Sequence, residues 1–362
     1  METAPTRMLV CTNKGLIVYR LSPTGWVFQQ KDFVGLPISQ ALVDPHTGRW
    51  WVALAHKHWG QKLHRSDDEG RTWQELAAPR YPKGSEAKPG VPASLKLMWA
   101  LAAGEADQPG RLYVGTEPGG LFRSEDGGEH FELIESLWNH PSRPKHWFGG
   151  GRNFAGIHSI VVDPRDSSHY YIAVSCAGVF ETRDDGASWQ VRNQGLRADY
   201  LPNPHAEVGQ DPHLLLACHT QPDILWQQNH CGIFRSVDGG QLWEDVTDEN
   251  GLANYGFALA IDHENPLRAW VIPATSDRIR VAVDQALCVC RTEDGGKSWE
   301  ALRTGLPQEN CFDIIFRHAL ARRGPHLAFG TTTGNLFVSD SDGDHWQNLS
   351  HFLPMINAVL FA

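Results

Sequence analysis

A short hairpin pattern recurs along the whole chain. Each copy has an apolar strand that usually ends in Arg and then Ser or Thr, a turn with Asp and Gly two positions apart, and a closing aromatic residue. Successive closing aromatics are 47 to 58 residues apart, the length of one four-stranded sheet with its loops. The copies are His64–Trp73, Phe122–Phe131, Phe180–Trp189, Phe234–Trp243, Cys290–Trp299 and Phe337–Trp346, with a degenerate first copy from Tyr19 to Trp26.

Two further strand signals lie between successive hairpins. Ile38–Val43 and Trp50–Leu54 flank an Asp-Pro turn, and so do Ile157–Val162 and Tyr170–Val174 in a later repeat. Each repeat is therefore expected to hold four antiparallel strands, lettered a to d, with the recurrent hairpin as the c–d turn. This organisation predicts an all-β fold built from four-stranded blades.

The two ends of the chain supply the parts of one blade. Residues 8–28 have the pattern of strands b, c and d without a strand a, and residues 356–362 have the pattern of a lone strand a. Pairing of the two segments would close the fold and hide the sheet edges that an open array exposes. We therefore predict a single domain over residues 1–362, a seven-bladed β-propeller.

The residue types of the hairpin have a direct structural use. An Asp such as Asp126 accepts backbone N–H bonds in a tight turn, the following Gly128 tolerates positive φ, and the closing aromatic buries apolar surface. Five copies keep Ser or Thr, Asp, Gly and the aromatic in register, and in this the chain resembles the Asp-box (BNR-repeat) β-propeller family, which includes sialidases. Ser341 replaces the Asp of the last copy, and the first copy has lost its Gly spacing, so these two hairpins are expected to be looser or differently capped.

Composition argues against some classes of partner. The formal net charge is -10 and Lys and Arg form no run, so binding to nucleic acid or to an anionic membrane is not expected. Asn13 and Lys14 interrupt the first apolar stretch, so neither a secretory leader nor a membrane span is predicted. Seven cysteines without a compact spacing fit reduced thiols. We therefore expect a soluble, cytoplasmic protein.

The long insertions all fall at one end of the predicted blades. In an up-and-down blade the b–c and d–a connections lie opposite the c–d turns, and binding residues concentrate on such variable loops. The insertions are residues 77–94, 135–156, 192–212 and 273–285. We predict a ligand-binding site at this loop end, with candidate binding residues Trp147, Arg152, Asn153, His158, Arg197, Asn229, His230, Arg278 and Arg280.

The resemblance to sialidases implies one chemistry for this site. Such enzymes use an arginine cluster for the substrate carboxylate, a Tyr nucleophile activated by a carboxylate, and an acid for the leaving group. Sialidases resemble a six-bladed propeller with an Arg-Ile-Pro signature near the first strand, whereas this chain has Thr12–Gly15 there. The candidates are the guanidiniums of Arg152, Arg197, Arg278 and Arg280, with Tyr200, Asp199 and Glu207 as the catalytic groups.

A second glycosidase chemistry needs two carboxylates. Other Asp-box glycoside hydrolases place the pair across a cleft between two propellers, whereas one propeller is predicted here. Glu117 is a further catalytic candidate, and Asp211 would be its partner across the mouth of the fold. The separation of the two carboxylates decides between a nucleophile and an activated water.

Two other functions stay open at the loop end. His56, His58 and His213 are candidate ligands for a divalent metal, with hydrogen-bonded structural histidines as the competing interpretation. The Gly-rich segment Trp147–Arg152 would suit a clamp that docks a protein partner. The sequence thus predicts a propeller that binds a small molecule or glycan, or a protein, and leaves open whether it is an enzyme.

Overall fold

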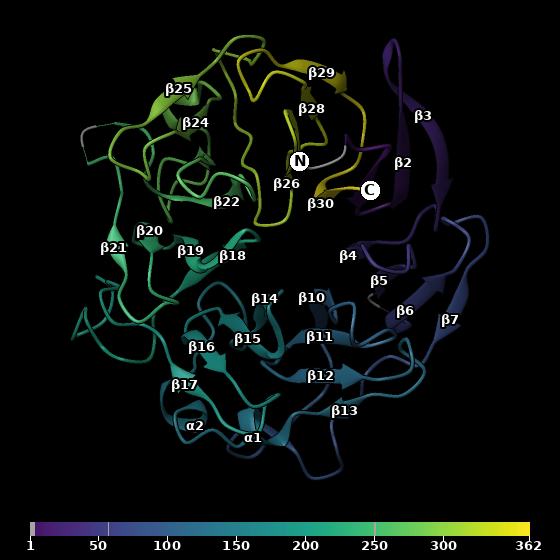
Figure 1. Ribbon diagram of the computed structural model, residues 1–362, viewed down its shortest axis with the longest axis vertical. Helices are drawn as coiled ribbons and strands as arrows, with labels where there is room; N and C mark the ends of the chain where they lie inside the picture. Colours follow the sequence, from purple (N-terminus) through teal and green to yellow (C-terminus); the bar gives the residue numbers. More distant parts are fainter. Residues whose placement is uncertain (1–3, 57, 250) are drawn as a thin grey trace. The chain divides into compact units, whose positions relative to one another are not determined.

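The computed structural model of the protein describes residues 4–56, 58–249 and 251–362. Within these ranges, the regular structure is almost wholly β and forms seven four-stranded antiparallel sheets (Figure 1). The predicted fold class, a seven-bladed β-propeller, is confirmed. The chain divides into two compact units, Ser39–Leu215 and Met1–Ile38 with Leu216–Ala362, and each is described by itself. A single domain over residues 1–362 stays a prediction.

Six of the described blades are continuous in sequence, with strands in the order a to d. In the two repeats for which the sequence analysis gives strands a and b, these strands coincide with the predicted ones within four residues. The blades are β4 (Ile38–Val43), β5 (Trp50–His56), β6 (Gly60–Ser66) and β7 (Gln74–Leu76); β10 (Leu97–Ala103), β11 (Leu112–Glu117), β12 (Leu121–Ser124) and β13 (Glu132–Leu133); β14 (Ile157–Asp163), β15 (Asp166–Val174), β16 (Gly178–Thr182) and β17 (Gln190–Val191); β18 (Pro212–Cys218), β19 (Gln221–Asn229), β20 (Gly232–Ser236) and β21 (Glu244–Asp245); β22 (Gly256–Ile261), β23 (Ala269–Pro273), β24 (Val289–Thr292) and β25 (Glu300–Leu302); and β26 (Leu320–Arg323), β27 (His326–Gly330), β28 (Leu336–Ser339) and β29 (Gln347–Ser350).

The remaining blade joins the two ends of the chain. Its strands, from a to d, are β30 (Ile356–Phe361), β1 (Arg7–Thr12), β2 (Gly15–Ser22) and β3 (Gly25–Asp32). Strands β1 and β30 are antiparallel, with Leu9 opposite Leu360 and Val10 opposite Val359. The predicted closure is confirmed, and it pairs backbone groups that two free strand edges would expose.

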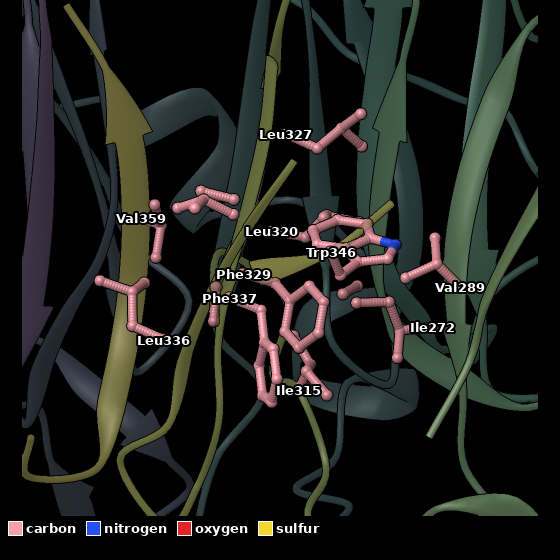
Figure 2. Close-up of a cluster of buried hydrophobic side chains, with 14 of the residues drawn as sticks. Ile272, Val289, Ile315, Leu320, Leu327, Phe329, Leu336, Phe337, Trp346 and Val359 are labelled. Atoms are coloured by element: carbon pink, nitrogen blue, oxygen red, sulfur yellow. The ribbon is translucent and has the colours of Figure 1, made fainter. Parts of the chain in front are cut away.

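Each unit has its own buried apolar core. In the unit that holds the chain ends, Trp346, Phe329 and Phe337 pack with aliphatic side chains, as Figure 2 shows. In the Ser39–Leu215 unit, one cluster gathers around Tyr170 and Phe180. Large side chains of this kind supply most of the hydrophobic stabilisation of a sheet protein.

The recurrent hairpins form the hydrogen bonds that their residue types predict. In the copy that starts at Thr182, the Thr182 hydroxyl donates to Asp184 Oδ1 (2.8 Å) and accepts the Gly186 N–H (2.9 Å), and the Ser188 N–H donates to Asp184 Oδ1 (2.8 Å). Gly186 has a φ of 85°, which favours glycine. The same three bonds occur in the hairpins at Ser66–Thr72, Ser124–His130, Ser236–Leu242 and Thr292–Ser298.

The last hairpin is capped differently, as predicted. The Ser341 hydroxyl takes the place of the carboxylate and accepts the His345 N–H (3.2 Å). The expectation that every closing aromatic is buried holds in full for Trp243 and Trp346. The others, Trp26, Trp73, Phe131, Trp189 and Trp299, are half-buried.

Ion pairs join neighbouring blades beside these hairpins. In the Ser39–Leu215 unit, Arg111 and Arg123 contact Asp185 of the next blade's hairpin (2.8 and 2.9 Å). In the other unit, Arg291 on β24 contacts Asp344 of the following hairpin (2.8 Å). The hairpin end of a blade, called the box end here, is therefore tied to its neighbour by charge.

A buried charged network lies at the box end of the β14–β17 blade. The imidazole of His169 lies between two buried carboxylates, with Nδ1 2.9 Å from Asp163 Oδ2 and Nε2 2.8 Å from Glu181 Oε1. Arg192 Nε also donates to Glu181 (2.7 Å). Burial acts to raise the pKa of Glu181, but hydrogen bonds from His169 and Arg192 outweigh it and hold that pKa at about 2.

The long insertions connect strand d to strand a, or strand b to strand c. Each therefore lies at the end of its own blade opposite the box hairpin, which is called the loop end here. The insertions contain the hairpin β8 (Glu86–Lys88) with β9 (Val91–Pro92), the helices α1 (Glu135–Trp138) and α2 (Arg143–His146), and the 3-10 turn η1 (Val283–Gln285). None of the helices in the described part of the chain has the length and apolar character to cross a bilayer.

Candidate functional site

Glu117 is a buried carboxylate at the loop end of the β10–β13 blade. It is the last residue of β11, and its side chain is 5% exposed. Arg152 Nη1 donates to Glu117 Oε2 at 2.9 Å, and the Arg152 side chain is 45% exposed. Two predicted site residues from separate parts of the chain are thus in direct contact, and a charge-assisted hydrogen bond holds the buried carboxylate.

Trp99 forms the base on which Arg152 lies. The Arg152 guanidinium is 4.4 Å from the centre of the Trp99 side chain, and His158 packs edge-on against that side chain at 5.5 Å. Trp99 and His158 both occupy bulges, where the pairing of β10 with β11 and of β14 with β15 shifts register. A bulge redirects a side chain out of the regular alternation, so both side chains are aimed at this contact.

Asp211 is a second buried carboxylate in the same unit. Its Oδ1 accepts the Cys176 N–H (2.9 Å) and the Ser175 hydroxyl (3.1 Å), both on the β15–β16 turn. Its Oδ2 is 3.6 Å from Nε2 of the buried His213. Asp211 therefore fixes the loop end of the β14–β17 blade, and Cys176, with a φ of 55°, is held in a turn that costs backbone energy.

One Gly-rich segment, Gly149–Arg152, contacts both carboxylate sites, through Cys176 at one and Glu117 at the other. A side chain at Gly150 would meet Cys176 Sγ at 2.6 Å, and one at Gly149 would meet the Arg152 carbonyl at 2.1 Å. Glycine is required at both positions because the backbone passes so close to its neighbours. The segment thus runs from the Asp211-bound turn to the Arg152–Glu117 pair.

Two predicted residues that flank this segment, Trp147 and Asn153, have structural contacts. Trp147 is half-buried, donates from Nε1 to Ser142 Oγ (3.0 Å) and lies 5.1 Å from the side chain of Phe180. The carbonyl of Asn153 accepts from Lys88 Nζ (2.8 Å). Ligand contacts by Trp147 and Asn153 stay predictions, and the observed contacts anchor the two ends of the Gly-rich segment.

The candidate residues for a sialidase-like chemistry contact different partners. Tyr200 donates its hydroxyl to the Gly209 carbonyl (2.9 Å), and Arg197 Nε lies 3.2 Å from Asp199 Oδ2. Arg152 and Arg197 thus have different carboxylate partners. Glu207 lines a separate cavity that is described below. The catalytic roles of Tyr200, Asp199 and Glu207 stay predictions.

The predicted metal ligands are not gathered at one point. His56 Nδ1 accepts the backbone N–H groups of His58 (3.1 Å) and Trp59 (2.9 Å), so it caps the β5–β6 turn. Lys57, between them, lies outside the described residues. Across the described positions, His56, His58 and His213 do not form a common group of metal donors. A divalent metal therefore stays a prediction.

The other unit has a cavity of about 360 Å³ at the loop end of its β22–β25 blade. His230, Tyr255 and Asp277 line it, and His230 Nε2 is 3.8 Å from Asp277 Oδ2. Arg280 lies with its guanidinium 5.4 Å from the centre of the Phe257 side chain, and Arg278 is exposed on the same loop. Asn229 is buried, and its Oδ1 accepts the Cys231 N–H (3.0 Å), which is a turn-capping contact.

Comparison with known proteins finds glycoside hydrolases among the sequence relatives. An oligoxyloglucan-reducing end-specific xyloglucanase of Emericella nidulans is 25% identical over 277 residues, which is 66% of this chain and 31% of that protein. The xyloglucanase Xgh74A of Acetivibrio thermocellus is 20% identical over 322 residues, 75% of this chain and 36% of that protein. The chain thus spans about a third of the length of these relatives. No family model matches it.

Solved structures share the fold. An ancestral GH74 enzyme superposes with a TM-score of 0.58 at 15% identity, covering 87% of this chain and 38% of that one. YCF48 from Cyanidioschyzon merolae superposes with a TM-score of 0.56 at 11% identity, covering 88% and 87% of the two chains. The GH74 enzyme of Niastella koreensis gives 0.52 at 13% identity, covering 95% and 67%. This chain is a seven-bladed β-propeller with GH74 and YCF48 proteins as structural neighbours.

Proposed function

We propose that the protein is an Asp-box β-propeller that binds an oligosaccharide at the loop end of the β10–β13 and β14–β17 blades. The observation that carries the proposal is the pair of buried carboxylates, Glu117 and Asp211, whose sites are both in contact with one Gly-rich segment. Carboxylates are strong acceptors for sugar hydroxyls, and glycoside hydrolases use two of them beside the glycosidic bond. Arg152, exposed and resting on Trp99, adds a donor group next to Glu117.

The sequence relatives support a glycan as the ligand. Both are xyloglucanases by name, and the aligned regions include 66% and 75% of this chain. A β-linked oligosaccharide derived from a polysaccharide of that kind is therefore the first ligand to test. Because the chain spans a third of those proteins, binding is the proposed activity, and hydrolysis is an additional outcome of the same test.

The hydrogen bonds of the hairpins support the Asp-box assignment within this proposal. Five copies share the same hydroxyl, carboxylate and glycine contacts. A sialidase-like activity is the finer form of the proposal and depends on Tyr200 as nucleophile. It would be supported if the wild type hydrolyses a fluorogenic sialoside and Tyr200→Phe does not. A cytoplasmic location is a separate proposal, which cell fractionation tests.

The binding proposal is tested by calorimetric titration with xyloglucan oligosaccharides. We expect Glu117→Gln and Asp211→Asn each to weaken binding at least tenfold, about 1.4 kcal/mol, because each removes a charged acceptor. Glu132→Gln, at an exposed position on β13, is the matched control and should bind as the wild type does. Release of reducing ends in the same samples measures hydrolysis. Wild-type protein that binds none of these oligosaccharides would refute the proposal.

Protein docking is the second candidate function. Trp59, at the loop end of the β4–β7 blade, is 77% exposed, and an exposed Trp is a frequent anchor in protein interfaces. A partner that co-purifies with the wild type and is lost with Trp59→Ala would favour docking. Retention of oligosaccharide binding in that variant would show that the two functions use different residues.

A further inference from the structure

A cavity of about 640 Å³ lies in the Ser39–Leu215 unit, formed by two insertions. The segment that includes α2 supplies His140 and Lys145, and the loop after β17 supplies Asn203 and Glu207. Trp189, the closing aromatic of the box hairpin, also lines it. Its volume is within the range of small-molecule sites, and neither Glu117 nor Asp211 lines it.

Buried polar side chains fix the loop wall of this cavity. Asn193 donates from Nδ2 to the Glu207 carbonyl (2.8 Å), and its Oδ1 accepts the Val179 N–H (2.8 Å). Gln210 donates from Nε2 to the Ala206 carbonyl (2.8 Å). Both amides are buried, so the loop is held by contacts inside the blade. Such a wall is preorganised, and ligand binding would not have to order it.

The opposite wall is fixed through Ser142 and Trp189. Ser142 Oγ accepts from Trp147 Nε1 (3.0 Å) and pairs with His140 Nδ1 (2.7 Å). Trp189 donates from Nε1 to Ser136 Oγ (3.1 Å), and this hydrogen bond holds the indole beside the cavity. The cavity is therefore built from side chains with defined positions on both sides.

The polar groups of the lining are both donors and acceptors. The Ser142 N–H donates to His140 Nδ1 (3.3 Å), so the proton of the neutral imidazole is on Nε2. Burial lowers the pKa of His140, which keeps it neutral near pH 7. Lys145 and the Asn203 amide add donors, and the Asn203 oxygen and the Glu207 carboxylate add acceptors. Such a set is suited to hydroxyl groups, each of which donates and accepts.

We propose that this cavity is a binding site for a neutral sugar, separate from the Glu117 and Asp211 site. The flat side chain of Trp189 would face the C–H surface of a pyranose, while Glu207, Asn203 and His140 bind its hydroxyls. A metal cation would find too few ligand atoms in this cavity, because Glu207 is the one carboxylate among the described lining residues. For the same reason the cavity lacks the two carboxylates of a glycosidase and is a binding site without hydrolysis.

The test uses single sugars and a signal from Trp189 itself. Protein labelled with 5-fluorotryptophan is titrated with methyl β-glucoside and with xylose at millimolar concentrations, and the Trp189 fluorine resonance is assigned with Trp189→Phe. We expect saturable movement of that resonance with at least one sugar. Glu207→Gln and Asn203→Ala should each weaken the binding at least fivefold because each removes hydroxyl partners. Glu132→Gln is the matched control and should titrate as the wild type does.

Two outcomes would overturn this site. One is a Trp189 resonance that no sugar moves, in protein whose thermal unfolding is normal. The other is a Glu207→Gln, Asn203→Ala double variant that titrates as the wild type does. Because the probes are single sugars and the signal comes from Trp189, neither outcome depends on whether oligosaccharides bind at Glu117.

Discussion

The box end and the loop end of the blades use polar residues in opposite ways. At the box end, Asp184 and its equivalents accept the same backbone groups in copy after copy, and Asp185 pairs with arginines of the preceding blade. At the loop end, Glu117 is held by Arg152 of a long insertion, whereas Asp211 is held by the short β15–β16 turn. Repetition marks the residues that fold the chain, and irregularity marks those available for a ligand.

Among the substitutions that test this comparison, Glu181→Ala at the box end should have the largest effect on the free energy of unfolding. The substitution removes one of the two buried carboxylates that contact His169, and with it the carboxylate that Arg192 Nε contacts. Breaking a buried charged network costs about 3–5 kcal/mol. Urea unfolding of the variant should show a loss of that size, and Glu132→Gln should show almost none. A loss below about 1 kcal/mol would mean that the box end tolerates irregular contacts as the loop end does.

Gly149→Ala should change ligand binding more than stability. The added Cβ would meet the Arg152 carbonyl at 2.1 Å, so the Gly-rich segment must change its conformation and shift Arg152 beside Glu117. We expect oligosaccharide affinity to fall about tenfold, or about 1.4 kcal/mol, with a smaller change in unfolding free energy. Titration and thermal unfolding of the same sample measure the two effects. An equal or larger loss of stability would assign this segment to the folding machinery.

Ser341→Asp should restore the standard hairpin in the last blade. The carboxylate would accept the His345 N–H in place of the hydroxyl, and a charged acceptor is stronger than a neutral one. We expect a gain of up to about 1 kcal/mol in the free energy of unfolding at pH 7. Urea denaturation with Ser341→Ala as the comparison measures it, and a destabilised Ser341→Asp protein would contradict it.

The smallest expected effect is on the pH dependence of stability that one hairpin carboxylate, Asp294, produces. Hydrogen bonds from Ser298 lower the pKa of Asp294 to about 2, below the ordinary value near 3.9. Its stabilising contribution is therefore present above pH 4 and is lost as the pH falls towards 2. Asp294→Asn should remove this part of the pH dependence of stability. Unfolding curves from pH 5 to pH 2 that have equal slopes for the two proteins would exclude it.

The sequence predicts the box end almost completely because its contacts are local. The hydroxyl, carboxylate and glycine of each hairpin lie within seven residues of one another, so spacing alone identifies them. The closure of β1 with β30 is also predictable, since one end lacks the strand that the other supplies.

The loop end is predictable in its location but not in its contacts. Glu117 and Arg152 are both identifiable as candidates, yet their pairing depends on how the insertion that holds Arg152 folds over the end of β11. Trp99 was not among the candidates, because it lies on a strand that reads as core and only the bulge redirects it. The Trp189 cavity was also missed, because a closing aromatic of the box hairpin has a structural role in every copy.

The pairing of β1 with β30 has a kinetic consequence. Closing a contact between residues so distant in the sequence costs more chain entropy than forming any local hairpin, so we expect this sheet to be completed last during refolding. Its dissolution would equally be an early step of unfolding. Substitutions along this seam should therefore change the lifetime of the native state more than the speed at which the other blades assemble.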